Sequence, residues 1–552
     1  MRNIELRAYE IHSPRMWQQS QIDMAFQFIE DHNLNALVLH ENALVEEIIF
    51  PDKYFSNEIM WQRWPVRRQG LLYRRDYMQK VARDAKKRGV ALFYETKEIY
   101  FDMTLLEMHP EVRNMDGSIC PSHPFWKEFL RSKMEELMDR VPELSGLIVS
   151  LGTQESLVSF AANRCHCERC QASNELEWYT AMLEAIYEPL KKRGKMLMAR
   201  DFSSNAARQD MLIEACRRVS DEIVVSLKIQ PHDYWPTFPN NPRIGKTGGL
   251  RNYIEFDVWG QFFGSGAFPT GQVEDIRQRL EYCYEKGVWG VAFRTDWELM
   301  TEAHTHNCLS MANLLAGSML AANLDTPLDD IYKLWVDKYL YNPLISGSYL
   351  QQPIHPSNPE AWKKLKAFVQ LAWKVFEKSY YIKKHIFLEH DQAPYTLEML
   401  FRDIDKRFLD DWEPGASERA KAKKENLAAI FAEKDESLML AAQLRETLDI
   451  PSLGLDEKTA ADYSIMIDAM VLYTEMCVLV AKSGYATRVA LETGDGEMLA
   501  LARSFLPQMD EWSARADAFL ENTEYPYYFY GRLPSLRMNL YTAHLRKRLG
   551  EE

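Results

Sequence analysis

The chain is short of several features that mark particular classes of protein. Its 8 cysteines in 552 residues are too few and too unevenly spaced for the disulfide framework of a secreted protein. Basic residues number 66 against 80 acidic ones, which gives a net charge of -14, and no basic cluster stands out. A chain with this charge repels phosphates, so its composition argues against a nucleic acid or an anionic membrane surface as a partner.

Long apolar segments are also missing. The first residues, MRNIELRAYEIHS, contain no apolar run after the basic start, which predicts that there is no secretory signal peptide. No segment approaches the roughly 20 apolar residues that a membrane span needs, so no span is expected. Together these absences predict a cytoplasmic protein with no membrane partner.

The chain does have enough apolar sequence for a large core, 46% of its residues, over a length that suggests more than one domain. Its first 325 residues repeat one unit, in which a β-rich run is followed by a polar loop and an amphipathic helix. Strands that alternate with helices pair in parallel, and eight units predict a closed barrel. The eight runs begin at Ile4, Ala36, Ala91, Gly146, Lys195, Ile223, Tyr253 and Val288.

The rest of the chain has a different pattern. From residue 326 the strand signal stops, and long helical patterns begin at Pro359, Ser417 and Glu457. No glycine-rich phosphate loop follows the first strand, which disfavours a dinucleotide-binding fold. The sequence predicts an α/β protein: a (β/α)8 TIM barrel over residues 1–325 and an all-helical C-terminal domain over residues 326–552, the latter a candidate surface for a homodimer.

Ionisable and aromatic side chains gather where the predicted strands end. In a barrel these ends share one face, where the chemistry of such proteins takes place. Carboxylates, cations and aromatic rings at one mouth are typical of a carbohydrate site, because sugar faces stack on rings and a pair of acids cleaves the glycosidic bond. The expected site residues are Glu95, Lys97, Glu155, Arg200, Lys228, Asp233, Trp235, Glu255, Trp259, Arg294 and Asp296.

The competing interpretation for any single one of these residues is a solvated loop position. It is weakest for the seventh strand, YIEFDVWG. Alternation places Glu255 or Asp257 inside the barrel wall, where an acid needs a partner.

Several segments resemble the glycoside hydrolase family 67 α-glucuronidases. VVSLKIQPHDYW and RNYIEFDVWG are similar to the part that carries the family's carboxylate pair, which implies that role for Asp233 and Glu255, with Lys228 on the lysine of the preceding strand. PELSGLIVSLGTQES resembles the strand that leads to the general acid, and so implies that role for Glu155. KMLMARDF resembles the strand whose arginine contacts the glucuronate, and so points to Arg200.

The resemblance implies an exo-acting hydrolase that removes a terminal uronic acid from oligosaccharides with inversion. Inversion calls for about 6.5–9.5 Å between the acid and base carboxyls, and retention for about 5–5.5 Å. The sequence departs from the family in two places. No N-terminal β-domain like that of the α-glucuronidases is expected before the first strand, which is compatible with a related but separate family. Ser150 lies near the place of a lysine that binds the sugar carboxylate, which argues against glucuronate as the recognised sugar.

Two other functions stay open. A substrate-assisted hexosaminidase shares the barrel but usually has an Asp-Glu pair after the fourth strand, where this chain has Gln154 and Glu155. A barrel that binds an oligosaccharide without cleaving it shares the aromatic mouth but does not need acids at three strand ends. Glu155, Asp233 and Glu255 together favour an enzyme.

The segment NRCHCERCQ places Cys165, Cys167 and Cys170 within six residues. Three thiolates need a fourth ligand to hold a structural zinc ion, and Cys120 or His166 would supply it. Reduced loop cysteines or one labile disulfide are the alternative. Because the segment follows shortly after Glu155, a metal here is expected to clamp the catalytic loop, and no cofactor is expected for catalysis itself.

Overall fold

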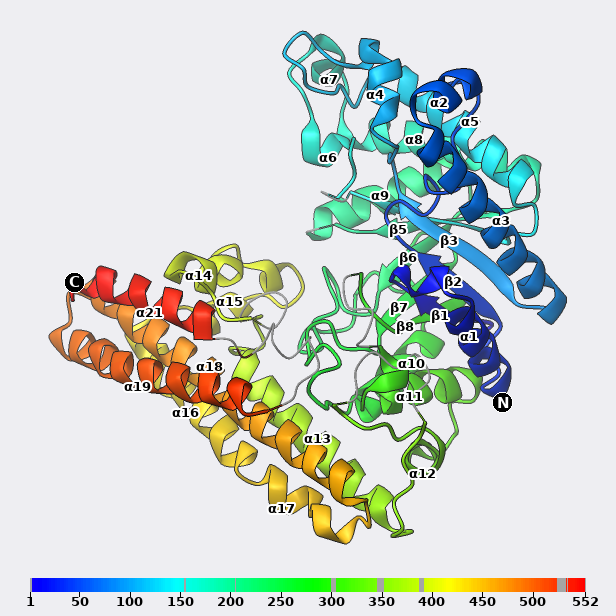
Figure 1. Ribbon diagram of the computed structural model, residues 1–552. Helices are drawn as coiled ribbons and strands as arrows, with labels where there is room; N and C mark the ends of the chain where they lie inside the picture. Colours follow the sequence, from blue (N-terminus) through cyan, green and yellow to red (C-terminus); the bar gives the residue numbers. More distant parts are fainter. Residues whose placement is uncertain are drawn as a thin grey trace. The chain divides into compact units, whose positions relative to one another are not determined.

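The computed structural model describes residues 2–551 apart from 153–154, 204, 299–303, 345–351, 387–391, 524–532 and 534. Eight parallel strands close into a barrel in sequence order, and β1 pairs with both β2 and β8 (Figure 1). This confirms the predicted barrel, and each strand begins within two residues of its predicted start. The strands are β1 (Leu6–Ile11), β2 (Ala36–His40), β3 (Ala91–Lys97), β4 (Gly146–Leu151), β5 (Met196–Asp201), β6 (Val224–Lys228), β7 (Asn252–Asp257) and β8 (Gly290–Arg294).

Helices connect the strands. The longer ones are α1 (Gln19–Asp31), α3 (Pro65–Arg88), α5 (Phe125–Arg140), α8 (Glu175–Lys192), α9 (Ala206–Val219) and α10 (Val273–Glu285), and short helices α2 (Asn57–Arg63), α4 (Thr104–Met108), α6 (Phe160–Asn163) and α7 (Glu168–Ala172) lie in the loops. Their ends follow local sequence rules. α3 ends at Gly89, whose φ of 69° is left-handed and suits glycine, and α8 begins where the Asn174 side chain accepts the N–H of Glu177.

The interior of the barrel has an apolar floor. Side chains two residues apart on a strand point to the same side, so alternate residues of each strand fill the centre in layers. These floor residues are nearly or fully buried and come from all eight strands: Leu6, Ala8, Ala36, Val38, Phe93, Ile148, Met198, Val224, Tyr253 and Ala292.

The chain forms two compact units. Each unit consists of several separate ranges, so the division is not a single boundary at residue 325. Unit 1 comprises Met1–His232, Asn241–Phe256 and Glu281–Arg294, and unit 2 comprises Asp233–Asn240, Asp257–Leu280 and Thr295–Glu552. The loops after β6 and β7 belong to unit 2 because they bond to its helical part. The Thr237 hydroxyl donates to the Lys384 carbonyl (2.7 Å), and the Tyr381 hydroxyl donates to the Phe262 carbonyl (2.5 Å).

The remainder of unit 2 is helical, as predicted for the C-terminal region. Its helices are α11 (Met311–Ala322), α12 (Leu328–Lys338), α13 (Ala361–Tyr380), α14 (Leu397–Asp405), α15 (Ala416–Ala420), α16 (Lys424–Ala441), α17 (Leu444–Leu448), α18 (Glu457–Thr493), α19 (Gly496–Glu521) and α21 (Ser535–Leu549). α18 packs against α13, α16 and α19. The helical pattern from Ser417 is broken into α15, α16 and α17. The Asn426 amide donates to the carbonyls of Glu418 and Lys421, which closes the end of α15.

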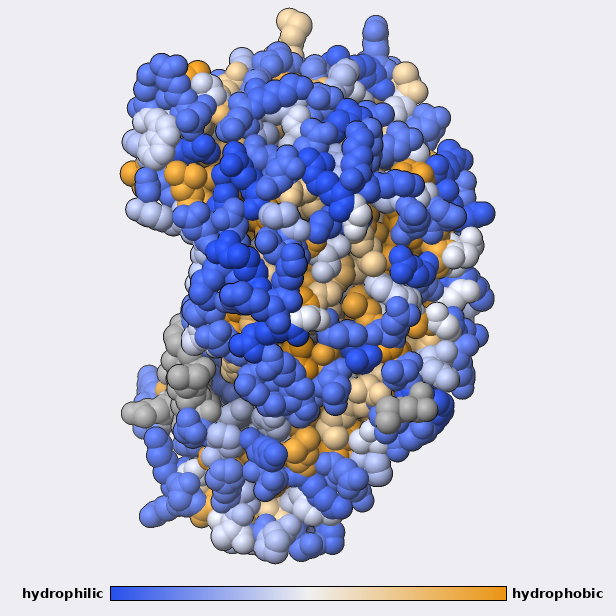
Figure 2. Space-filling model, turned by 90° about the vertical axis from the view of Figure 1, so that its right-hand side faces the viewer, coloured by the Kyte–Doolittle hydropathy of each residue, from blue (hydrophilic) through white to orange (hydrophobic). Residues whose placement is uncertain are grey.

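α18 is long and apolar enough to cross a membrane, judged by length and composition alone. The expectation that no segment meets this test was therefore wrong. Within the part of the chain that the structure describes, 67% of its most apolar window is buried inside the protein, as in the core helix of a bundle. The face drawn in Figure 2 is mostly hydrophilic, with apolar residues in patches between polar ones.

Candidate active site

A layer of polar side chains lies above the apolar floor. Each member follows a floor residue by two positions, so the alternation that turns Ala8 inward also turns Glu10 inward. All are at most 2% exposed, and every strand supplies one: Glu10, His40, Glu95, Ser150, Arg200, Ser226, Glu255 and Arg294. Buried charges on this scale require partners.

Arg200 connects two of the carboxylates. Its Nε lies 2.9 and 2.8 Å from the two carboxylate oxygens of Glu255 and 3.1 Å from Oε1 of Glu95. Its Nη1 donates to the Ser150 hydroxyl (3.0 Å), and the Ser226 hydroxyl donates to Glu255 (2.5 Å). These donors stabilise Glu255 as a carboxylate. The guanidinium that was expected to contact the sugar is therefore committed to the barrel's own groups.

Glu95 can hold a proton at neutral pH. Burial raises the pKa of Glu95 to about 7, against the opposing effect of Arg200 and with a further rise from Glu255 and Glu10. Burial also holds the pKa of His40 well below its usual value, so its imidazole is neutral. The ring lies between two carboxyls, with Nδ1 3.0 Å from Glu10 and Nε2 3.1 Å from Glu95. The Nδ1 contact with Glu10 is a hydrogen bond, whereas the close approach of Nε2 to Glu95 lacks hydrogen-bond geometry.

His12 joins this group, because the ligand atoms of Glu10, His12 and His40 lie within 4.8 Å of one another. Two imidazoles and a carboxylate are a possible metal site. However, Arg200, Lys97 and Arg294 act electrostatically on His40, and a further cation beside these charges is unfavourable. We interpret the group as a buried polar cluster that packs against Glu95, whose own hydrogen bond comes from the Ser150 hydroxyl (2.9 Å).

Three cations meet at the ring of Phe202. The Nζ atoms of Lys228 and Lys97 lie 4.1 and 5.1 Å from its centroid, and the Arg200 guanidinium carbon lies 5.3 Å away. Both lysines are buried, whereas Phe202 is half-buried. Cations on the face of a ring are attracted to it, and here they lie beside an aromatic surface that is partly accessible. Phe202 was not predicted, although it follows Arg200 by two residues on the inward alternation.

Glu155 and Lys97 are brought together. The Glu155 side chain is 41% exposed in the loop after β4, and its Oε2 lies 2.5 Å from the Lys97 Nζ, whose side chain is 1% exposed. The predicted general acid is therefore accessible, and its partner is one of the cations at Phe202.

The loop that carries Glu155 lies beside a second buried acid. Glu98, the residue after Lys97, is fully buried, and its two carboxyl oxygens have no hydrogen-bond partner within the part of the chain that the structure describes. Burial raises the pKa of Glu98 to about 7.

Four of the other predicted site residues, Asp233, Trp235, Trp259 and Asp296, belong to unit 2. Asp233 is half-buried and accepts the N–H of Tyr234 (2.9 Å), and Asp296 is fully buried. Asp257, the alternative inward acid of β7, accepts the N–H groups of Trp259, Gly260 and Gln261 at 3.1, 3.1 and 2.6 Å. Its partner is thus the backbone of the following turn.

The two tryptophans expected to stack on a sugar are packed inside unit 2. Trp235 is 1% exposed and contacts Phe238 and Phe262, with centroids 4.8 and 5.9 Å apart. Trp259 has no exposed surface. Neither ring offers an open face in this structure, which corrects their predicted role. Aromatic residues near a strand end are as easily core residues as ligand platforms, and only burial distinguishes the two.

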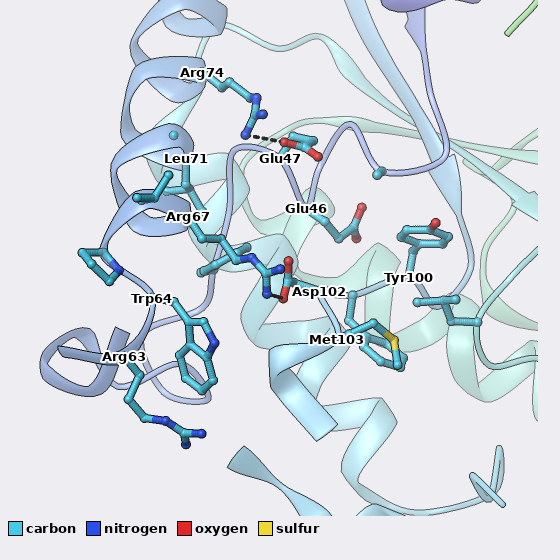
Figure 3. Close-up of a pocket in the computed structure, with 17 residues that line it drawn as sticks. Glu46, Glu47, Arg63, Trp64, Arg67, Leu71, Arg74, Tyr100, Asp102 and Met103 are labelled. Carbon is cyan, nitrogen blue, oxygen red and sulfur yellow. Dashed lines mark hydrogen bonds and ion pairs between the residues drawn. The ribbon is translucent and has the colours of Figure 1, made fainter. Parts of the chain in front are cut away.

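A hollow of about 840 Å³ opens beside the loops that follow β2 and β3 (Figure 3). Its wall includes Trp64 and three arginines, each paired with an acid: Arg63 with Glu107 (3.3 Å), Arg67 with Asp102 (2.7 Å) and Arg74 with Glu47 (2.6 Å). Leu157, two residues beyond Glu155, also lines it. The hollow therefore adjoins the loop of the predicted acid.

The four predicted zinc ligands are close together. The sulphur atoms of Cys120, Cys165, Cys167 and Cys170 all lie within 4.8 Å of one another. The structure selects Cys120 over His166 as the fourth member of this group.

No family model and no curated protein matches the chain. Among solved structures, it is similar to a GH138 enzyme described as targeting pectin rhamnogalacturonan II, with 11% identity, a TM-score of 0.62, and coverage of 99% of this chain and 83% of that one. It is also matched to an O-GlcNAc hydrolase mutant of Thermobaculum terrenum (13% identity, 100% and 94% coverage, TM-score 0.42). A GH20 exo β-N-acetylglucosaminidase of Vibrio harveyi is matched as well (11% identity, 59% and 56% coverage, TM-score 0.38).

The first likeness shows a shared fold over almost the whole chain. The other two TM-scores are below 0.5 and carry no argument. Family 67 is not shown by these comparisons, so the resemblance to the α-glucuronidases stays a prediction.

Proposed function

We propose that the protein is an exo-acting glycoside hydrolase that removes a terminal acidic sugar from oligosaccharides. The observation that carries the proposal is the convergence of Lys97, Arg200 and Lys228 on Phe202, directly beside the carboxyls of Glu95 and Glu255. Cations beside an accessible aromatic ring suit a sugar that carries a carboxylate, a group that a neutral sugar lacks. The fold shared with a glycoside hydrolase over almost the whole chain supports the same class of reaction.

The acidic sugar stacks one face on Phe202 and directs its carboxylate to Lys97 and Lys228. Aromatic stacking and a charge-assisted contact fix both the ring and its orientation. Arg200 adds positive charge at this position while it remains bonded to Glu255 and Glu95.

Glu155 donates the proton to the leaving oxygen. In the free protein its partner is Lys97. A substrate carboxylate that binds Lys97 competes with Glu155 for this lysine, which allows the Glu155 side chain to turn toward the leaving oxygen.

Glu255 supplies the carboxylate on the other side of the reaction. A base or nucleophile must be ionised, and the donors from Arg200 and Ser226 favour that state. The inverting outcome of the α-glucuronidases is part of this proposal.

The rest of the oligosaccharide occupies the hollow lined by Trp64 and Leu157. The leaving group extends from the bond that Glu155 protonates, and the hollow begins two residues beyond Glu155. A closed exo-site of this kind suits short oligosaccharides, and we place the enzyme in the cytoplasm, where such products would be imported.

The test is proton NMR of the purified protein with a panel of disaccharides and oligosaccharides. The panel contains glucuronosyl and galacturonosyl sugars, pectin-derived fragments, and neutral and N-acetylhexosaminyl controls. Glu155→Gln is run beside the wild type, and Glu177→Gln, an exposed glutamate on α8, is the matched control. We expect an acidic monosaccharide to be released by the wild type and by Glu177→Gln but not by Glu155→Gln. The first anomer to appear distinguishes inversion from retention.

Release of N-acetylhexosamine instead would establish the hexosaminidase alternative. Binding of acidic sugars without release by the wild type would establish a non-catalytic binder. Lys228→Met should raise KM for the acidic substrate by roughly 10-fold or more, as expected for losing about 1.5–3 kcal/mol of charge-assisted hydrogen bonding.

A further inference from the structure

Four cysteine thiols form a compact group on unit 1, away from the polar layer of the barrel. Cys120 comes from the segment between β3 and α5, and Cys165, Cys167 and Cys170 come from the α6–α7 region after β4. The sulphur of Cys120 lies 3.4 Å from that of Cys167 and 3.7 Å from that of Cys170. The sulphur of Cys165 lies 3.3 Å from that of Cys167 and 3.4 Å from that of Cys170.

We propose that these four cysteines bind one structural zinc ion. Zinc–thiolate bonds of about 2.3 Å in a tetrahedron place the sulphurs about 3.8 Å apart. The observed spacings of 3.3–3.7 Å are slightly shorter than this and fit a single ion at the centre after a small expansion. Four protein ligands leave no open position, as in structural rather than catalytic zinc sites.

Other uses of four thiols fit less well. Disulfide sulphurs lie about 2.05 Å apart, and all four cysteines are free, each contacting two neighbours rather than one. An iron–sulfur cluster places several irons and sulfides between its thiolates and requires a wider ligand spacing.

The surroundings of the group are those of a supported metal site. The indole N–H of Trp126 donates to the Cys120 carbonyl and that of Trp178 to the Pro121 carbonyl, both at 2.9 Å. Arg164 donates to the Cys170 carbonyl (2.8 Å). Outer contacts fix ligand-bearing backbone, and cations offset the negative charge of a zinc tetrathiolate.

The ion would connect two segments of unit 1 that are distant in sequence. One end lies before α5, and the other lies in the chain that leads from the Glu155 loop to α8. Removal of zinc should therefore loosen the α6–α7 region while the barrel stays folded.

Zinc content of the full-length protein, purified without chelators or a histidine tag, tests the site directly. Plasma mass spectrometry should give about one zinc per chain for the wild type and less than about a tenth of that for Cys167→Ser. The matched control is Cys216→Ala, a buried cysteine of α9 outside the group, which should retain the full content. This readout is independent of sugar turnover, so the zinc site and the proposed function can fail separately.

If Cys167→Ser does not fold, the site can still be tested in the wild type by replacing zinc with cobalt(II). Four thiolates around cobalt give an intense thiolate-to-metal charge-transfer band, and this band is expected at one equivalent. Limited proteolysis of the zinc-depleted protein should cut first between residues 155 and 173. Three results would overturn the proposal: a wild type without zinc that gives no cobalt band, equal zinc in Cys167→Ser and the wild type, or iron in place of zinc.

Discussion

The pH dependence of stability offers a direct test of how deeply the mouth of the barrel is buried. The Glu98 carboxyl has no exposed surface, and burial raises its pKa to about 7 from 4.5. Between these two pH values the folded chain binds the proton more tightly than the unfolded chain does. The free energy of unfolding therefore falls as pH rises through this window and levels off above it. At about 1.4 kcal/mol per pH unit, the loss attributable to Glu98 is roughly 3 kcal/mol.

Glu98→Gln keeps the shape of the side chain and its hydrogen-bonding capacity but cannot ionise. At pH 5, where the wild-type carboxyl is protonated, the variant should lie within about 1 kcal/mol of the wild type. At pH 8.5 it should be more stable by about 2–3 kcal/mol, because the wild type then carries a buried charge. Glu95, whose pKa is also raised to about 7, titrates in both proteins and cancels from the difference.

Urea unfolding followed by circular dichroism at the two pH values gives the comparison. Glu30→Gln is the matched control, since Glu30 is exposed and pairs with Arg88 at the surface, where loss of the pair costs at most about 1 kcal/mol. The reasoning fails if Glu98→Gln keeps the pH dependence of the wild type, or if the variant is the less stable protein at pH 8.5.

Two further substitutions test the barrel by urea unfolding. Arg200→Leu leaves the buried Glu255 and Glu95 without their shared cation and should lower the free energy of unfolding by about 3–5 kcal/mol at pH 8. The loss should be smaller at pH 5, because the carboxyls can then be protonated. An equal loss at both pH values would contradict the assigned ion pairs. Gly146→Ala should cost about 1–3 kcal/mol, because the new Cβ would lie 2.4 Å from the Met196 carbonyl oxygen on β5, whereas its control Gly70→Ala on α3 should be neutral or stabilising.

Much of the candidate site follows from the alternation of the strands. Each polar residue of the layer stands two positions after an apolar one, as Glu95 follows Phe93 and Arg200 follows Met198. The same rule extends to Phe202, which is uncharged and was not among the expected site residues. Strand pattern is local, so the sequence alone can identify which side chains share the barrel interior.

The sequence could not decide what each of those side chains contacts. That Arg200 bonds Glu255, that Lys97 bonds Glu155, and that Cys120 joins a group of cysteines some 45 residues later all depend on how distant segments pack. The same holds for burial, which separates Trp235 in the core from the half-buried Phe202.

The sequence by itself therefore determined the eight strands, the barrel they form and the helical region that follows. The hydrophobic period and the turn residues act over a few neighbouring positions, so they can be recognised in the sequence alone. The tertiary structure alone decided the ion pairs of the polar layer, the cations gathered at one ring and the four sulphurs within reach of a single ion. Charge pairing and metal coordination act between atoms a few ångströms apart, and closure of the barrel brings those atoms together from all parts of the chain.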